Sequence, residues 1–408
     1  MEPPGSTPSH YEGTEERRVT VFLCGDVMTG RGIDQILPHP SDPTIYEPVV
    51  CDARTYIELA EAVNGPIPRP VEFSYIWGDA WAELQRVAPG ARIVNLETSV
   101  TRSDEPWPKG INYRMHPENV GCLTVAGIDV CVLANNHVLD YGYSGLVETL
   151  ETLHGAGLKT TGAGRTLTEA RQPAAVDVSG DARVVVHGFG TKSSGIPSSW
   201  AATENRPGVN FVSDLSEAEA AAIVERVRED KRNGDITIAS IHWGTNWGYE
   251  VSGAQIRFAH RLIDGGIDIV HGHSSHHPRP IEVYRNRIIL YGCGDFINDY
   301  EGICGYEEYR PDLALMYYPT VNPANGESVQ LRMMPMQLCK MRLNRAAPGE
   351  IRWLKDTLAR ISKCLGSRVE EADDGSLFYA GNQHQDPSAI VTLRSRSLGS
   401  PKGGNANG

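Results

Sequence analysis

The feature that most constrains this fold is a repeated order along the chain: an apolar strand-like run, a polar loop, then a helix-like stretch. The segment "GIDVCVLANNHVLDYGYSGLVETLETLHGAG" has this order, with Leu146, Leu150 and Leu153 at helical spacing. The same order returns in "DITIASIHWG" and the stretch "SGAQIRFAHRLIDGG" that follows it. One hairpin is predicted around Arg285 and Asn286. Strands separated by helices predict an α/β domain with mixed sheets.

The pattern predicts one domain over residues 18–390, between a disordered arm at 1–17 and a disordered tail at 391–408. Both ends are rich in Gly, Pro, Ser and charged residues, which cannot bury enough apolar surface to order the chain. The stretch near 35–75 is long for a connection, so we expect an insertion close to the working face. Residues 300–390 give no clear pattern; they could add strands, a lid or a small subdomain.

Composition excludes several classes of protein. The formal net charge of −13 and the absence of a long basic run argue against a nucleic-acid partner, because such binding depends on clustered Lys and Arg. The N-terminus lacks a secretory signal, and no apolar stretch approaches the roughly 20 residues that span a bilayer. We therefore expect a cytoplasmic protein that does not use a membrane. The eight cysteines lack CxxC spacing and are predicted to be reduced, mostly buried thiols.

Polar side chains follow the predicted strands. An internal similarity between "AGIDVCVLANNH" and "GGIDIVHGHSSHH" places imidazole at two such strand ends. Ligands of α/β sheets gather outside the carboxyl ends of strands, so residues far apart in sequence can converge there. Carboxylate, amide and imidazole groups together suit one or two divalent metal ions, whether Mn, Zn, Fe, Ca or Mg. The candidates are Asp26, Glu97, Asn136, His137, His242, His273 and His276.

Each candidate alone also has a structural explanation. Asp26 could cap a loop, Glu97 could form a surface salt bridge, and Asn136 could satisfy a turn. His242 could pack beside Trp243. The joint pattern favours a metal site, because every candidate falls at the same end of a predicted strand.

Six motifs carry a resemblance to a known family. The segments "GDVMTGRGID", "NLETSVT", "NNHVLDYG", "IHWG", "GHSSHH" and "LYGCGDFIND" occur in the order found in CapA-type proteins. These proteins are named for poly-γ-glutamate capsule synthesis and lie within the calcineurin-like metallophosphatase superfamily. The resemblance covers roughly residues 19–300. It implies a metallophosphatase-like double mixed β-sheet sandwich flanked by helices, with a metal site at the C-terminal ends of the strands.

The resemblance also implies roles for individual residues. Asp26 resembles the first metal ligand, Glu97 the acid that bridges two metals, Asn136 the amide ligand and His137 the catalytic histidine. His242, His273 and His276 resemble the later histidine ligands. Two departures matter: Met28 stands where an Asp-x-His motif has histidine, and "GHSSH" is longer than Gly-His-x-His. One metal position is therefore expected to be weak, empty or differently ligated, for example by Asp295.

The predicted function is that of a peptide epimerase, because the chain resembles the lasso-peptide epimerases of this family. It would invert the α-carbon of the C-terminal Trp of a ribosomal precursor peptide, its expected partner. A divalent metal stabilises the enolate, while an acid and a base exchange the proton. His137 is the first candidate for this pair; Asp26, Asp295 and His276 remain open for the second.

Two other functions stay open. Superfamily resemblance suggests a metal-dependent phosphoesterase, although fold kinship alone does not establish chemistry. A non-enzymatic capsule factor that binds polyglutamate is disfavoured, since an acidic protein repels an anionic polymer. Trp243, Trp247 and Tyr249 could hold an indole or simply pack in the core. The oligomeric state is left open.

Overall fold

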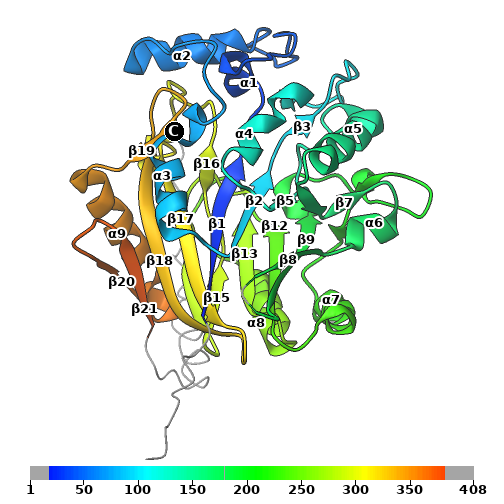
Figure 1. The fold of residues 1–408 in the computed structure, drawn as a ribbon, viewed down its shortest axis with the longest axis vertical. Coiled ribbons are helices and arrows are strands. Elements are labelled where there is room, and N and C mark those ends of the chain that lie inside the picture. The colour runs from blue at the N-terminus through cyan, green and yellow to red at the C-terminus, as the bar shows by residue number, and fades with distance from the viewer. Residues whose placement is uncertain (1–17, 179, 382–408) are drawn as a thin grey trace, which may run out of the picture.

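The computed structural model describes residues 18–178 and 180–381. The arm predicted at 1–17 and the tail predicted at 391–408 lie outside the described residues. Two large mixed β-sheets, of ten and seven strands, and the helices beside them make up most of the described chain (Figure 1). The prediction of an α/β fold with mixed sheets is confirmed.

The first sheet is built around β1 (Val19–Val27). On one side it continues in parallel through β2 (Ala91–Leu96), β5 (Val130–Val132) and β6 (Lys159–Thr161). On the other side it continues antiparallel through β17 (Leu313–Asn322), β18 (Glu327–Leu338), β21 (Leu377–Gly381) and β20 (Ser367–Glu371). Two short strands complete it: β16 (Asp295–Ile297) parallel to β1, and β19 (Leu343–Arg345) beside β18.

The second sheet has a parallel centre. Its order is β11 (Phe211–Val212), β9 (Arg183–Thr191), β12 (Asp235–His242), β13 (Ile269–His273), β15 (Arg287–Leu290) and β14 (Ile281–Tyr284), with β8 (Ala174–Asp177) beside β9. Arg285 and Asn286 join β14 to β15 with φ of 48° and 59°. Positive φ at both positions suits a tight hairpin, so the predicted turn is confirmed.

The two sheets pack face to face. On β1, alternate residues point to opposite faces: Val21 and Leu23 enter an apolar cluster that also contains Ile238 of β12, whereas Phe22 and Cys24 enter a different one. The second cluster lies under α3 (Gly78–Val87), α4 (Gly121–Thr124) and α5 (Gly142–Gly155). A third cluster lies between the second sheet and α7 (Glu217–Asp230) and α8 (Gly253–Asp264). Helices therefore cover the outer face of each sheet.

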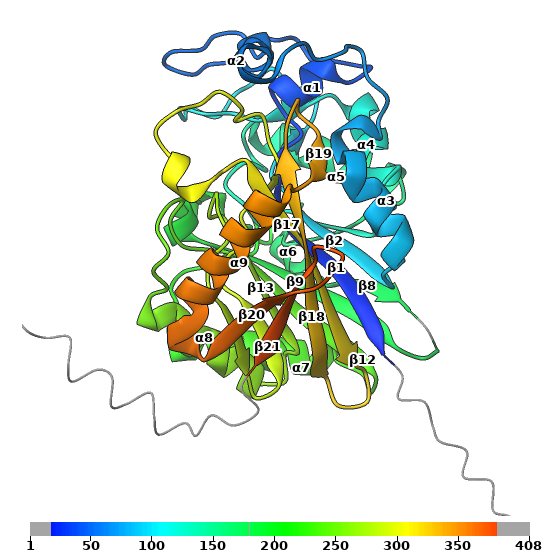
Figure 2. The ribbon, with the colours of Figure 1, turned by 90° about the vertical axis from the view of Figure 1, so that its left-hand side faces the viewer.

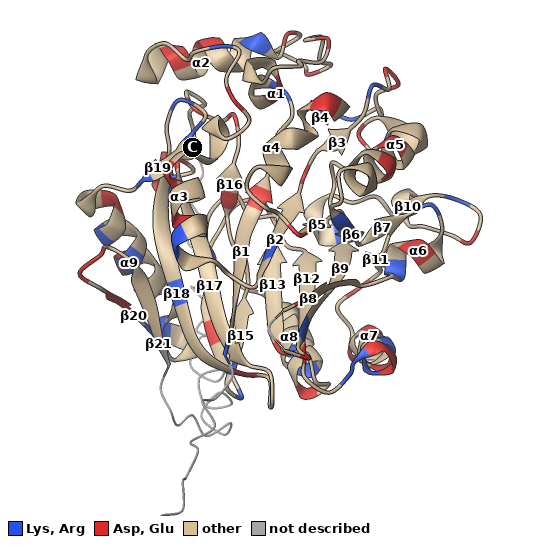
Figure 3. Ribbon diagram, viewed as in Figure 1, with Lys and Arg blue, Asp and Glu red and all other residues tan. Residues whose placement is uncertain are grey.

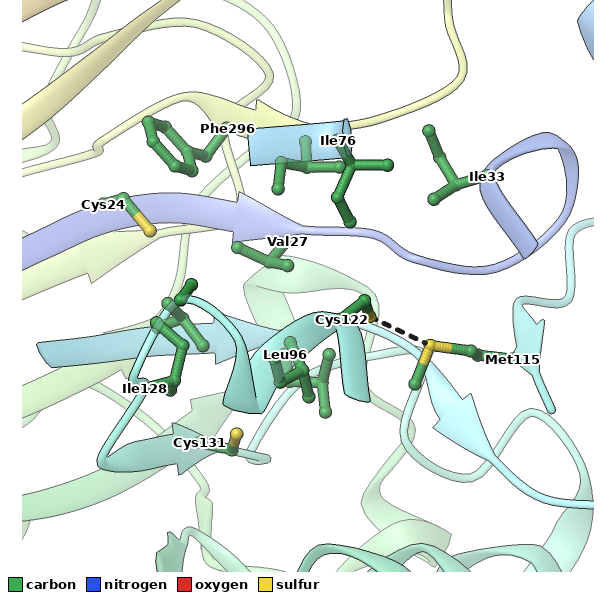
Figure 4. Packing of buried hydrophobic residues seen from close by; sticks show 14 of the residues in the cluster. Cys24, Val27, Ile33, Ile76, Leu96, Met115, Cys122, Ile128, Cys131 and Phe296 are labelled. Carbon is green, nitrogen blue, oxygen red and sulfur yellow. Dashed lines mark hydrogen bonds between the residues drawn. The ribbon is translucent and has the colours of Figure 1, made fainter. Parts of the chain in front are cut away.

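Sulfur side chains fill part of the core under the helices. Figure 4 shows Cys24, Cys122 and Cys131 there, with the Cys122 Sγ 3.8 Å from the Met115 Sδ. All eight cysteines are free. The predicted burial holds for those three and for Cys293, whereas the structure exposes others: Cys51, Cys304 and Cys364.

The segments that the sequence left open have definite places. Within 35–75, α2 (Arg54–Asn64) follows α1 (Gly32–Ile36), and both lie beyond the end of the sheet to which β1 points (Figure 1). Residues beyond 300 add β17 to β21 to the first sheet, and α9 (Pro348–Ser362) packs across it (Figure 2). The remaining short strands and α-helix of the described residues are β3 (Ser99–Val100), β4 (Arg114–Met115), β7 (Ala163–Gly164), β10 (Gly208–Val209) and α6 (Leu167–Arg171). In the ranges 18–178 and 180–381, no helix has both the length and the apolar composition needed to cross a bilayer.

Candidate metal centre

Strand pairing brings the predicted ligands together from two sheets. In the first sheet, Asp26 pairs with Asn95 of β2 on one side and with Asp295 of β16 on the other. In the second sheet, His242 of β12 pairs with His273 of β13. Because the sheets pack face to face, the acidic and amide groups of one edge meet the imidazoles of the other.

Asp26, His242 and His273 form a buried group that could hold a metal ion. Their ligand atoms all lie within 4.8 Å of one another. The Nδ1 atoms of His242 and His273 are 2.8 Å apart, and the His273 Nδ1 lies 3.9 Å from Asp26 Oδ1. Two imidazole nitrogens this close must share a proton or a cation, because their lone pairs repel each other. One carboxylate and two imidazoles are ligands that divalent metals such as zinc accept.

Glu97 and Asn136 lie on the other side of His242. The His242 Nε2 is 2.8 Å from Asn136 Oδ1 and 3.9 Å from Glu97 Oε1. Asn95 Nδ2 donates to Asp26 Oδ1 at 2.7 Å and to Glu97 Oε2 at 3.2 Å. Asn95 thus holds the two carboxylates in one place.

His276, in the loop after β13, and Asp295, at the start of β16, close the centre. The His276 Nδ1 is 2.9 Å from Asp295 Oδ1, and Asn298 Nδ2 donates to Asp295 Oδ2 at 3.0 Å. The backbone N–H of Ser274, at φ 100°, donates to Asp26 Oδ2 at 3.1 Å. A non-glycine residue in this region stores strain, which proteins tolerate mainly at functional sites. The structure therefore gathers every predicted ligand and also Asp295.

The electrostatics of the centre favour a cation. Burial raises the pKa of Asp26 to about 7, and the Asp295 carboxylate adds to this rise. Burial, and then the Asp26 carboxylate, raises the pKa of Glu97 well above its usual range. Burial lowers the pKa values of His242 and His273 well below their usual range, which keeps both rings neutral as ligands must be. Crowded carboxylates beside neutral imidazoles fit a divalent ion.

His137 sits at the rim of this centre. Its Nδ1 is 2.6 Å from Asp140 Oδ2, and its Nε2 is 3.8 Å from Glu97 Oε1. Lys109 Nζ lies 2.6 Å from Asp140 Oδ1 and donates to the Asn136 carbonyl at 2.5 Å. Burial lowers the pKa of His137 to about 4. Asp140 therefore orients this ring so that its Nε2 faces Glu97.

Several residues at the site were missed by the sequence prediction. Asn95 had a signal, since it lies two residues before Glu97 and so on the same strand face. Asp140 also had one, three residues after His137 in a turn. Lys109 and Arg31 had none. The buried Arg31 guanidinium pairs with Asp299 and Glu47 from distant loops, and it lies over the ring of Tyr113, which packs against His137.

The aromatic candidates divide into two groups. Trp243 is buried against Phe258 and Tyr291, so it is a core residue and not a binding residue. Trp247 lies beside His276, with ring centroids 5.2 Å apart, and stacks on Tyr306. Tyr249 joins the same cluster through Tyr309, because the centroids of these two rings are 5.3 Å apart.

Comparison with known proteins adds relatives in polymer synthesis. Residues 20–300 match the family model described as bacterial capsule synthesis protein PGA_cap, a range that contains every residue of the candidate centre. A probable polyglutamine synthesis accessory protein of Mycobacterium tuberculosis is 50% identical over 361 residues, which are 88% of this chain and 95% of that protein. The PGA biosynthesis protein CapA of Bacillus subtilis is 28% identical, over 74% of this chain and 67% of that one. The capsule biosynthesis protein CapA of Bacillus anthracis is 26% identical, over 70% and 61%.

These relatives overturn the predicted reaction. Their names describe polyglutamine and capsule synthesis, so the prediction of a lasso-peptide epimerase that inverts a C-terminal Trp is wrong. The disfavoured alternative, a factor in polyglutamate capsule synthesis, agrees better with them. The resemblance to CapA-type proteins is confirmed, and the chain belongs to the bacterial capsule synthesis protein PGA_cap family.

Proposed function

We propose that this protein is an accessory factor in the synthesis of a glutamate- or glutamine-based polymer, and that it acts through a divalent metal held by Asp26, His242 and His273. The observation that carries the proposal is the 50% identity to a probable polyglutamine synthesis accessory protein over 95% of that protein's length. The buried ligand group at the strand ends supports the chemistry, because its donors suit a divalent ion.

The residues around the centre have distinct parts in this proposal. When bound, a divalent cation polarises a carbonyl or phosphoryl oxygen beside it. Glu97, Asn136 and Asp295 lie close enough to complete the ligand set. Asp140 accepts the Nδ1 proton of His137, which leaves the Nε2 of that ring to take up or release a proton next to Glu97.

Net charge bears on which polymer the centre accepts. The formal charge of −13 opposes a long polyanion, but a polymer with amide side chains is neutral and meets no such repulsion. Acidic and basic residues both occur along helices such as α7 and α9, so neither helix presents charge of a single sign (Figure 3). We therefore expect oligoglutamine to bind more tightly than oligoglutamate of equal length.

The experiment compares these oligomers directly. Protein loaded with Mn²⁺ is titrated with oligoglutamine and with oligoglutamate, and chain length is followed by mass spectrometry. We expect binding or a change of chain length that disappears with chelator and in Asp26→Asn. The matched control is Asp235→Asn, a buried carboxylate at the opposite end of β12 that pairs with Arg183. Failure of both oligomers to bind the metal-loaded protein would reject the proposal.

A second candidate is phosphoester hydrolysis. The His137–Asp140 pair beside Glu97 favours it, because an oriented histidine next to a metal centre can protonate a leaving group. Two sheets packed face to face, with ligands at their strand ends, also agree with a metallophosphatase-like sandwich. Turnover of p-nitrophenyl phosphate or its bis ester with Mn²⁺, without any effect on the oligomers, would favour this candidate.

A further inference from the structure

Behind His273, on the side away from Asp26, a chain of hydrogen bonds runs between the two sheets. The His273 Nε2 lies 3.0 Å from the Ser240 Oγ, and the same oxygen lies 3.0 Å from the His271 Nδ1. The His271 Nε2 lies 2.7 Å from the carbonyl oxygen of Cys24 on β1. All three side chains are fully buried. Ser240 and His271 are direct partners across β12 and β13, two residues before His242 and His273 and on the same face of the sheet.

The carbonyl oxygen of Cys24 on β1 fixes the direction of every hydrogen bond in this series. A carbonyl oxygen can only accept, so the His271 Nε2 carries a proton. In a neutral ring the His271 Nδ1 then has only a lone pair, and it must accept the single hydroxyl proton of Ser240. The Ser240 oxygen can therefore only accept from the other ring. The Nε2 of His273 carries the proton, and its Nδ1 is left with a lone pair.

We infer that Ser240 and His271 are positioning residues that fix the tautomer of His273 and thereby point the lone pair of its Nδ1 into the metal centre. The inference rests on the proposed metal centre, and it adds residues to which no role at that centre has been given. The Nδ1 of His273 is the atom that faces His242 and Asp26. A ring with its proton on Nδ1 could not bind a metal there, so a fixed tautomer favours binding without any rearrangement.

The first test measures metal affinity. Ser240→Ala removes the hydroxyl that joins the two rings, and loss of such an outer partner weakens metal binding by about 10- to 100-fold. Competition titrations with Zn²⁺ and a chromophoric chelator give this ratio without any substrate. Ser240→Thr keeps the hydroxyl and is expected to recover most of the affinity. Ser362→Ala is the matched control. The buried Ser362, at the end of α9, accepts the Ile281 N–H on its Oγ at 3.0 Å, and loss of this hydroxyl should leave Zn²⁺ affinity unchanged.

The second test needs no variant that might fail to fold. Nitrogen-15 NMR of metal-free wild-type protein distinguishes a protonated from an unprotonated ring nitrogen. We expect the His273 signals to show a protonated Nε2 and an unprotonated Nδ1, with the same tautomer at His271. A protonated Nδ1 at His273, or equal Zn²⁺ affinities in wild type and Ser240→Ala, would overturn the inference. Neither measurement uses a polymer. Absence of polymer activity would therefore reject the proposed function, whereas the roles of Ser240 and His271 would still be decided by Zn²⁺ affinity and by the NMR signals.

Discussion

At the scale of single residues, neighbours decide what each histidine does. His242 and His273 face carboxylates and each other, which suits metal ligands. His260 stacks on Tyr284 and is held by Glu282, so it is structural. The histidine-rich loop that stood out in the sequence contributes His273 and His276 to the centre, whereas the neighbouring His277 packs on Trp247.

A buried histidine outside the centre gives a prediction about pH. Burial, reinforced by Arg226, lowers the pKa of His187 in β9 to about 4. From about pH 6.5 down to about 4, the unfolded chain takes up a proton at this ring and the folded chain does not, so stability falls as pH falls. The loss at the acid limit is about 3 kcal/mol for this group.

Urea unfolding of chelator-treated protein at pH 7 and pH 5 checks the prediction. His187→Gln cannot take up the proton, so its free energy of unfolding should fall less between these pH values than that of the wild type. The other histidines are the same in both proteins. The difference between the two decreases in the free energy of unfolding therefore isolates the contribution of His187. Parallel falls would show that this ring does not contribute.

At the scale of elements, the rule that ligands follow strand ends works for β1, β2, β12 and β13. Asp295 is the exception, because it begins β16 instead of following a strand. It reaches the centre because β16 lies parallel to β1 and starts beside Asp26. Helix starts also follow local signals: the Ser216 Oγ accepts from the Glu219 N–H at the start of α7, and both halves of a capping box form at Ser252 of α8.

The contact of β1 with the loop before β16 gives a second prediction. A Cβ on Gly25 would lie 1.7 Å from the Gly294 carbonyl oxygen, and neither backbone can yield without moving Asp26. The Asp26 N–H also donates to that oxygen at 3.0 Å. Gly25→Ala should therefore lower the free energy of unfolding by about 3 kcal/mol or more and weaken Zn²⁺ binding.

Denaturant titration and a metal-binding assay measure the two effects. The matched control is Gly155→Ala at the end of α5, where an added Cβ meets nothing within 4 Å. Alanine favours a helix over glycine, so the control should be unchanged or more stable by about 0.5 kcal/mol. If Gly25→Ala unfolded and bound Zn²⁺ as the wild type does, the tight contact between Gly25 and the Gly294 carbonyl oxygen would be contradicted.

At the scale of the whole molecule, the sequence predicted the alternation of strands and helices and the residues that converge. Hydrophobic periodicity and polar residues at strand ends are local signals, which a sequence shows directly. The sequence did not predict that residues beyond 300 extend the first sheet, since the pairing of β17 with β1 joins segments about 300 residues apart in sequence. Lys109 and Arg31 were missed because loops with no periodic pattern carry them to the centre. Net charge misled the choice of function, because the repulsion between a protein of charge −13 and a polyanion does not apply to a neutral polymer.

Metal binding tests the central claim most directly. Isothermal titration of chelator-treated protein with Zn²⁺ should show saturable binding of one or two ions, and 100 Kd of free metal should stabilise the fold by about 2.7 kcal/mol. Asp26→Asn and His273→Ala should each weaken binding by about tenfold or more, whereas Asp235→Asn should bind as the wild type does. Absence of saturable binding, or equal affinity in all four proteins, would contradict a metal centre at these strand ends.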